Sequence, residues 1–336
     1  MTLENKKSAD CLFARCIYDN LKCMFEGNRL VHVSPILVNK LADFIYHGPE
    51  YVQVRILTKD YCEVICDFDH TLSKYTHNAE RVPVCHVNAK GLFIKNSRIP
   101  EVCRLRLKEL SDFYSPFETS PDMYAYEKSC LMKEFWNLAH KALVDGNVSR
   151  EDIDCCVMEG GIVLRNNVNV FVNKLNQLSI PIIIFSGGIG NVIETVLMSS
   201  GVSLDNVRVV SNFMDFNPEG RLVGFQDPII HCCNKTYDVL RNTEYFETTL
   251  SKRMCILLLV TQLVMPTWLM IGKLFLVKKL WLFNDEKLKL FSSLYDLILL
   301  SDETFDVPLF ILSSIFNIDE VCNHEKKKKN FTNSNI

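Results

Sequence analysis

The sequence predicts an α/β fold, in which a Rossmann-like, doubly wound parallel sheet carries an inserted helical cap domain. Short apolar runs such as CEVIC (62–66) and IPIIIF (180–185) indicate strands that are buried on both faces. After residue 166 such strands alternate with helical patterns, including NVNVFVNKLNQL and SGGIGNVIETVLMSSG, which is typical of parallel sheets. Between about 100 and 165 the apolar spacing is helical only, as in YEKSCLMKEFWNLAHKAL, so this block interrupts the sheet.

These patterns divide the chain into segments. We expect a helix over 34–47, a short strand over 51–56, and a hairpin within FNPEGRLVGF with Pro-Glu-Gly at its tip. The predicted segments are an N-terminal extension of unpredicted structure (1–30), a catalytic core (31–80 and 166–325), a helical cap (81–165) and a disordered basic tail (326–336).

Composition limits the classes of function. The 336 residues are 48% hydrophobic, which is typical of a globular protein. The formal net charge of -3 does not indicate the excess of basic residues that nucleic-acid binding requires. The 14 irregularly spaced cysteines and the absence of an apolar leader predict reduced thiols in the cytoplasm. Neighbouring side chains diverge, so we expect no zinc at the adjacent groups, which are Cys155-Cys156, Cys85-His86 and His231-Cys232-Cys233.

Two carboxylates follow the first core strand, at the edge where such sheets bind ligands. Asp67 and Asp69 are two residues apart, and extended backbone would direct both side chains to one side. Clustered carboxylates favour Mg²⁺. Asp67 could attack phosphorus as a nucleophile, and Asp69 could protonate the leaving group and then activate water. The D-x-D-x-T pattern, which ends at Thr71, is common, so a carboxylate pair that caps a turn is the alternative.

Two further features favour phosphate chemistry. Ser186-Gly187-Gly188 follows an apolar strand and opens a predicted helix, where a hydroxyl and backbone N–H groups would bind phosphate; an ordinary glycine-rich turn is the alternative. Lys235 follows a polar loop and could neutralise phosphoryl charge, although an isolated lysine there would usually be solvated. The order of the three features is more specific than any one of them.

Four segments together resemble the cytosolic 5′-nucleotidase III (pyrimidine 5′-nucleotidase) family of the haloacid dehalogenase superfamily. They are DFDHTLS, IFSGGIG, VVSNFMDFNPEGRLVGF and HCCNKTYDVLRNTEYF. The resemblance runs from about residue 34 to 258 and resumes near FNDEKL and YDLILLSDET, whereas residues 1–30 have no counterpart. It implies a haloacid dehalogenase core with a helical cap. It also implies Mg²⁺-dependent removal of phosphate from nucleoside 5′-monophosphates, pyrimidine or 7-methylguanosine, through an aspartyl-phosphate.

The resemblance assigns roles to single residues. Asp67 would be the nucleophile and a Mg²⁺ ligand, and Asp69 the acid/base that gives its backbone oxygen to the metal. The phosphate-binding residues would be Thr71, Ser186, Gly187 and Lys235. In the cap, Glu118 matches the glutamate that reads the nucleobase, with a solvated surface carboxylate as the alternative. Ala139 stands where the family has a serine that contacts substrate, so that contact is in doubt.

One expected motif is missing. The resemblance requires Gly-Asp-Ser-x-Gly-Asp after the apolar run ILLL, but the chain continues VTQLVMPTWLM, and no aspartate lies between Asp238 and Asp285. The third metal carboxylate is therefore absent near Val260-Thr261. A membrane helix over Met254–Gly272 is disfavoured by its polar residues and by its place within a soluble-enzyme pattern. A degenerate core segment and a shifted reading frame are the two remaining possibilities.

The genetic code permits the shifted frame. If the codon before Val260 ends in G, reading one base earlier allows Gly-Asp-Ser-Ile-Gly-Asp-Ala-Asn-Met-Ala-Asp, which restores the motif. We therefore expect residues of about 259–281 to be out of frame and the register to return at Phe283-Asn284-Asp285. An error in the sequence and a real insertion or deletion would both produce this result.

The sequence therefore favours a monomeric, cytoplasmic 5′-nucleotidase without membrane or nucleic-acid partners, whose literal chain is impaired. One alternative is a catalytically inactive nucleotide-binding relative, and the other is a nucleoside phosphotransferase. Base preference and oligomeric state are not determined by these patterns.

Overall fold

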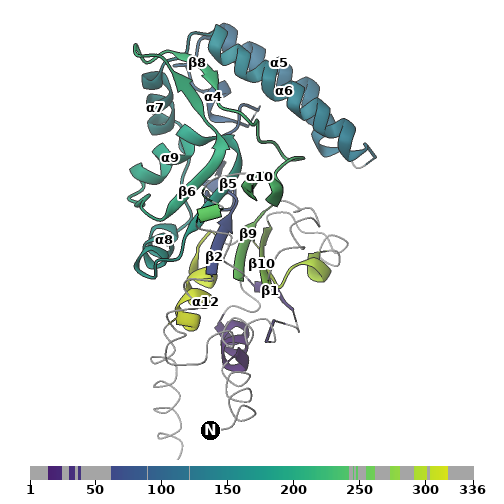
Figure 1. The fold of residues 1–336 in the computed structure, drawn as a ribbon, viewed down its shortest axis with the longest axis vertical. Coiled ribbons are helices and arrows are strands. Elements are labelled where there is room, and N and C mark those ends of the chain that lie inside the picture. The colour runs from purple at the N-terminus through teal and green to yellow at the C-terminus, as the bar shows by residue number, and fades with distance from the viewer. Residues whose placement is uncertain are drawn as a thin grey trace, which may run out of the picture.

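A seven-stranded sheet forms the centre of the structure, a computed structural model, in the order β1-β11-β10-β9-β2-β5-β6 (Figure 1). The structure describes residues 14–24, 30–34, 37–38, 62–88, 90–120, 122–241, 245, 247–248, 255–261, 273–280, 291–300 and 303–316. The strands are β1 (Leu30–Val33), β2 (Cys62–Cys66), β5 (Ile182–Ile189), β6 (Val207–Asn212), β9 (Cys255–Val260), β10 (Lys273–Leu280) and β11 (Leu297–Leu300).

The chain direction around the sheet confirms the predicted doubly wound topology. From β2 the chain continues through β5 and β6 on one side, whereas β9, β10 and β11 lie on the other side, and all these neighbours are parallel. The order therefore reverses at β2, and ligands of such sheets bind at this switch point. Only β1 is antiparallel, paired with β11; this strand was not expected from the sequence.

Helices cover the sheet and extend beyond it. Between β2 and β5, α5 and α6 pack along each other and α7 packs against α9 (Figure 1). Ser149 begins α7 through reciprocal bonds with Asp152, a capping box that satisfies two backbone donors. The helices are α4 (Leu92–Lys95), α5 (Glu101–Thr119), α6 (Ala125–Asp145), α7 (Arg150–Glu159), α8 (Val168–Gln177), α9 (Gly190–Ser199), α10 (Tyr237–Arg241) and α12 (Asp306–Phe316).

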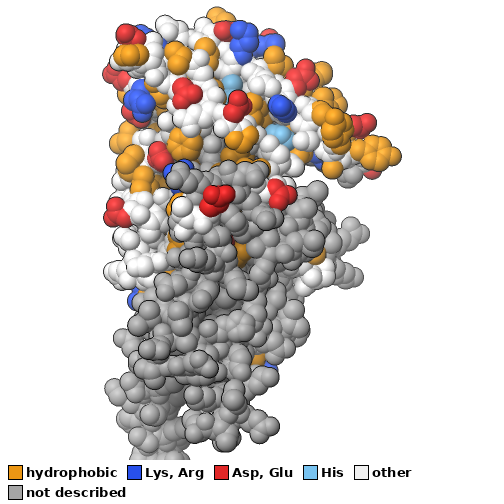
Figure 2. Space-filling model, in the orientation of Figure 1, with side chains coloured by type: hydrophobic (Ala, Val, Ile, Leu, Met, Phe, Trp, Pro, Cys, Tyr) orange, Lys and Arg blue, Asp and Glu red, His pale blue; other side chains and the backbone are white. Residues whose placement is uncertain are grey.

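A hairpin joins the core to these inserted helices. Strands β7 (Met214–Phe216) and β8 (Leu222–Phe225) pair antiparallel, as predicted, and β8 packs against α6. A second small hairpin consists of β3 (Thr76–His77) and β4 (Glu80–Arg81). Large apolar side chains remain exposed on α5, on α6 and at the turn between them (Figure 2), namely Val102, Leu105, Phe113, Tyr124 and Tyr126. The boundaries of a separate cap domain stay a prediction.

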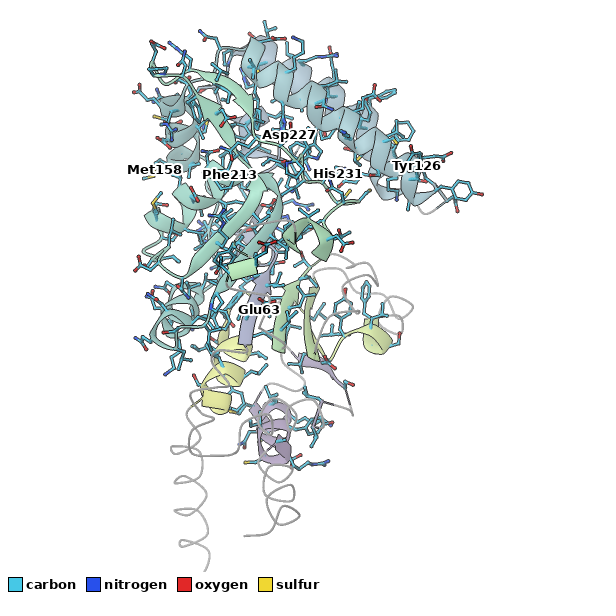
Figure 3. All side chains as sticks on the ribbon, viewed as in Figure 1. Glu63, Tyr126, Met158, Phe213, Asp227 and His231 are labelled. Carbon is cyan, nitrogen blue, oxygen red and sulfur yellow. The ribbon has the colours of Figure 1, made fainter. Side chains whose placement is uncertain are left out.

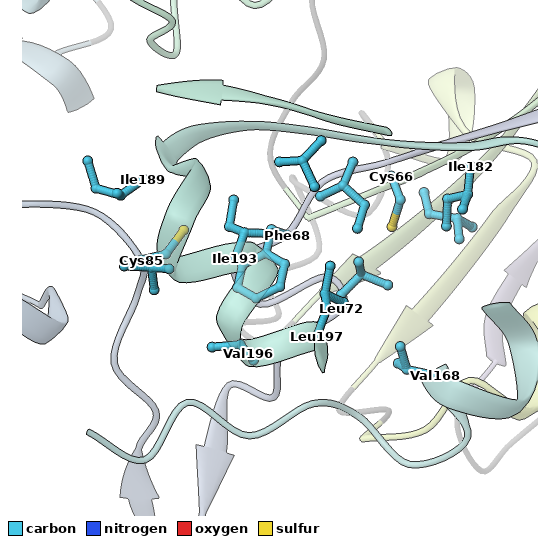
Figure 4. Packing of buried hydrophobic residues seen from close by; sticks show 14 of the residues in the cluster. Cys66, Phe68, Leu72, Cys85, Val168, Ile182, Ile189, Ile193, Val196 and Leu197 are labelled. Atoms are coloured by element: carbon cyan, nitrogen blue, oxygen red, sulfur yellow. The ribbon is translucent and has the colours of Figure 1, made fainter. Parts of the chain in front are cut away.

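The core has two halves because side chains alternate across a strand. Val64 and Cys66 of β2 join the cluster beneath α8 and α9, whereas Ile65 joins a second cluster that includes Leu240 of α10. Figure 4 shows Cys66, Ile182 and Ile193 within the first cluster. This sheet is buried on both faces, and its strands therefore have nearly continuous apolar sequences.

Two segments that the sequence left uncertain are partly described. Residues 14–24 are helical, and Ala14, Ile17 and Leu21 are buried against the main core, so part of the N-terminal extension is folded. The tail 326–336, the strand 51–56 and most of the helix 34–47 lie outside the described residues.

Strand β9 covers the first part of the apolar segment at 254–272. Cys255–Val260 pairs with both β2 and β10, so a membrane helix over the whole segment is wrong, and residues 262–272 lie outside the described part of the chain. No helix within the described residues combines the length and the apolar character needed to cross a bilayer.

Candidate active site

The D-x-D-x-T turn begins where β2 ends. The N–H of Asp67 donates to the Leu259 carbonyl at 3.0 Å, which extends the pairing with β9 by one residue. Arg165 is buried and stabilises the turn by donating to the carbonyls of Thr71 at 2.9 Å and His70 at 2.5 Å. These bonds fix the backbone on which both carboxylates stand.

Asp67 is paired with a cation and two hydroxyls. The Lys235 ammonium lies 2.5 Å from Oδ1 of Asp67. The hydroxyls of Thr71 and Thr261 lie 3.3 and 3.4 Å from Oδ2. Asp67 is 9% exposed, and burial of an ion pair strengthens the Coulomb attraction while removing hydration. The sequence pattern thus brings Asp67, Thr71 and Lys235 together.

Asp69 has a different set of partners. The Cys85 N–H donates to Oδ1 at 2.9 Å, and the Cys85 thiol donates to Oδ2 at 3.0 Å. Nε2 of His86 lies 3.3 Å from the same Oδ2. Burial, followed by the charge of Asp69, raises the pKa of the Cys85 thiol well above its usual value, so the thiol stays protonated and acts as a donor. Sequence reasoning considered Cys85 and His86 only as metal ligands and missed this role.

Ser186 lies inside a strand, which corrects the predicted helix start. Strand β5 continues to Ile189, with an irregular register between Phe185 and Ile189, and α9 begins only at Gly190. The Ser186 hydroxyl accepts from the Gly188 N–H at 3.1 Å and lies 3.9 Å from the Cys85 sulfur. A Cβ on Gly188 would lie 2.1 Å from that sulfur, so this close approach requires glycine. Cys85 therefore links Ser186 to Asp69.

Asn212 joins β5 to the loop that carries Lys235. Its amide donates to the carbonyls of Gly187 and Ile230, both at 2.8 Å, and its oxygen accepts from the Ile230 N–H at 2.8 Å. Asn212 is fully buried. The VVSNF segment therefore has a structural role. In the sequence it indicated only a family resemblance.

Thr261 directly follows β9, at the position where the missing carboxylate was expected. Its hydroxyl lies 3.4 Å from Oδ2 of Asp67 and 3.3 Å from the main-chain oxygen of Asp69. A carboxylate, a carbonyl and a hydroxyl therefore meet here, and hard oxygens of this kind fit Mg²⁺. Only Asp67 contributes a charge to this set, and Lys235 already pairs with it. The fit is therefore that of a weakly held ion.

Glu118 lies near the loop that follows β8. It stands in the last turn of α5, and its negative charge acts on the nearby thiol of Cys232. The hydrogen bond from Cys232, then the nearby His231 and Lys128, lower the pKa of Cys233 to about 5, while the pKa of Cys232 is raised chiefly by its bond to Cys233. Ala139 is fully buried in α6.

Comparisons with known proteins agree with the resemblance. Residues 70–316 match the pyrimidine 5′-nucleotidase (UMPH-1) family. The chain is 37% identical over 259 residues to 7-methylguanosine phosphate-specific 5′-nucleotidase A of Xenopus laevis, which covers 75% of this chain and 87% of that protein. It is 33% identical over 261 residues to the 7-methylguanosine phosphate-specific 5′-nucleotidase of Homo sapiens, covering 76% and 85%.

A solved structure has the same fold. The crystal structure of cytosolic 5′-nucleotidase IIIB bound to cytidine aligns with a TM-score of 0.75 at 24% identity, over 90% of this chain and 98% of that one. The likeness confirms the predicted α/β core with its associated helices.

Proposed function

Because the chain belongs to the pyrimidine 5′-nucleotidase (UMPH-1) family, we propose that it binds nucleoside 5′-monophosphates and hydrolyses their phosphate ester. The observation that carries the proposal is the pairing of Asp67 with Lys235 at 2.5 Å at the switch point of the sheet. A buried carboxylate beside a cation is suited to attack a dianionic phosphate whose charge the cation offsets.

In the first step, a carboxylate oxygen of Asp67 attacks phosphorus, and the bond from phosphorus to the 5′-oxygen breaks. Lys235 stabilises the negative charge on the phosphoryl oxygens. Asp69 gives a proton to the leaving 5′-oxygen, so the nucleoside leaves as a neutral alcohol. The bonds from Cys85 and His86 to Asp69 support this role because they fix the orientation of its carboxyl group.

In the second step, Asp69 removes a proton from water, and the water oxygen attacks phosphorus. The acyl-phosphate bond breaks, which releases phosphate and restores Asp67. Ser186 and Gly187 would bind the phosphoryl oxygens from the bulged end of β5. When Mg²⁺ is bound, by Asp67, the Asp69 carbonyl and Thr261, it supplies further charge neutralisation on the phosphate.

Glu118 is the residue that would select the base. Its carboxylate can accept hydrogen bonds from an exocyclic amino group, such as that of cytosine or of 7-methylguanine. The substrates named in the relatives, 7-methylguanosine phosphates, support this class.

Phosphate release from CMP, UMP and 7-methyl-GMP with excess Mg²⁺ tests the proposal. We expect slow, Mg²⁺-dependent release that Asp67→Asn reduces to background. Asp154→Asn, which changes an exposed carboxylate on α7, is the matched control and should leave the rate unchanged. Measurable release that Asp67→Asn leaves unchanged would overturn the assignment of Asp67.

One observation favours a second candidate function. Thr261 stands at the metal position without a charge, so the chain could bind nucleotides without turning them over. Equilibrium binding of CMP without any phosphate release would support this inactive, nucleotide-binding alternative.

Location and oligomeric state extend the proposal. A cytosolic enzyme is supported by the name of the structural relative. The monomeric state is carried over from the sequence, and size-exclusion chromatography would test it.

A further inference from the structure

The loop between β8 and α10 contains three adjacent metal-binding side chains. The ligand atoms of His231, Cys232 and Cys233 all lie within 4.8 Å of one another, and the two sulfur atoms are 3.6 Å apart. Within the described part of the chain, no other group of three histidine, cysteine or acidic side chains meets this condition. The expectation that adjacent side chains diverge is therefore wrong for this loop.

The side chains converge because the chain reverses at this point. The His231 carbonyl accepts from the N–H groups of Asn234 and Lys235 at 3.2 and 3.1 Å, and the His231 N–H donates to the Asn234 side chain at 2.7 Å. The Cys233 N–H also donates to Nδ1 of the His231 ring at 3.2 Å. This tight turn brings together side chains that an extended strand would direct to opposite faces.

The sulfur separation fits one tetrahedral ion. With zinc–sulfur bonds of about 2.3 Å, two thiolates on a tetrahedral ion lie about 3.8 Å apart, close to the observed 3.6 Å. His231 is buried, Cys233 is half-buried and Cys232 is exposed, so an ion can reach the sulfurs from solvent.

The charge of Glu118 at the end of α5 acts on the Cys232 thiol, but its carboxylate is not part of the group whose ligand atoms lie within 4.8 Å of one another. Figure 3 shows His231 between α10 and the α5–α6 hairpin. The loop therefore supplies two sulfurs and one nitrogen, and the fourth position of a tetrahedral ion is left for water or another small ligand.

We propose that His231, Cys232 and Cys233 bind one thiophilic divalent cation of the zinc class. Hard ions such as Mg²⁺ would not compete for it, because they prefer oxygen ligands. Its ligand atoms differ from the oxygens around Asp67, although His231 lies next to Gly187.

The position of this site gives it a consequence for activity, which rests on the proposed function. Lys235 follows Cys233 by two residues and pairs with Asp67, and Glu118 is the proposed base-reading residue. An ion held by this loop would restrain the segment that carries Lys235 and place positive charge near Glu118. We therefore expect zinc to inhibit nucleotide hydrolysis.

Metal binding is tested on the reduced full chain, without oxygen and without nucleotide. Cd²⁺ titration followed by thiolate-to-metal absorbance reports sulfur ligation, and competition of Zn²⁺ with a chromophoric chelator gives stoichiometry and affinity. We expect one tight equivalent, weakened at least about 100-fold in Cys232→Ser/Cys233→Ser. Removing two ligands should weaken metal binding at least as much as removing a residue that only supports a ligand, which typically costs roughly 10–100-fold in affinity.

The matched control is Cys130→Ser/Cys155→Ser, which also removes two accessible thiols and should keep the tight equivalent. Circular dichroism of both variants verifies folding. Equal affinity in the two double variants would overturn the proposal. Because no nucleotide is present, a failure of the hydrolase proposal does not affect these results.

Discussion

Thr261→Asp restores a carboxylate at the one site position where the chain lacks it. The Thr261 hydroxyl lies 3.4 Å from Oδ2 of Asp67 and 3.3 Å from the Asp69 carbonyl, so an aspartate here would face the same ion. Two unit charges about 4 Å apart interact by about 4 kcal/mol at an effective dielectric constant of about 20. A doubly charged ion would therefore gain about 8 kcal/mol from the added carboxylate.

Dehydration of the carboxylate removes several kcal/mol of this gain, which leaves about 4 kcal/mol. Since about 1.4 kcal/mol corresponds to a factor of ten, we expect Mg²⁺ affinity to rise roughly a thousandfold. Without Mg²⁺ the same aspartate repels Asp67, so the metal-free variant should unfold at a lower temperature than the parent chain.

The assay is a Mg²⁺ titration of phosphate release from CMP, with thermal unfolding measured at each concentration. Thr261→Asn, of nearly the same size but neutral, is the control and should give no gain in affinity. If Asp and Asn at 261 give the same Mg²⁺ dependence, the placement of the ion beside Thr261 is refuted.

Three further predictions concern the frame, the core and pH. Replacing residues 259–281 by the frame-shifted reading should raise phosphate release well above that of the literal chain, and equal rates would count against the frame hypothesis. Asn212→Ala leaves the Gly187 and Ile230 groups unsatisfied, so urea unfolding should show a loss of about 3 kcal/mol. Asn169→Ala, at an exposed position of α8, should lose little. Burial lowers the pKa of His140 from 6.5 to about 3, so the unfolded state binds the proton first and stability is lost as pH falls below 6.5. By about pH 5 the unfolding free energy should have dropped about 2 kcal/mol more than in His140→Gln, and parallel pH curves would contradict this.

Much of the sheet could be predicted because its strands are buried on both faces. CEVIC and IPIIIF are apolar throughout and end in polar residues, so β2, β5 and the position of Asp67 follow from the sequence. The four-residue strand β1 has no such signal, and its partner β11 is distant in the chain. The SGGIG segment is equally compatible with a helix start and with a bulged strand end, which is why the start of α9 was misplaced.

Site contacts between distant segments could not be predicted from spacing. Cys85 and His86 reach Asp69 only because the segment after the small β3–β4 hairpin returns to the edge of the sheet. Arg165 bonds to the carbonyls of residues far away in the chain, and nothing in the local pattern around it indicates this. Cys232 and Cys233 converge because the chain reverses direction here, and the Asn234 side chain stabilises this turn. The sequence spacing of the two cysteines does not indicate such a turn.

The central claim is that Asp67 is the group that accepts phosphate. It is tested most directly by quenching a reaction with CMP in acid, for the chain and for Thr261→Asp, and mapping the phosphorylated peptide by mass spectrometry. We predict phosphate on the peptide that contains Asp67, in larger amounts for Thr261→Asp, and none for Asp67→Asn. Phosphate released to solvent while Asp67→Asn remains as active as the parent chain would contradict the claim.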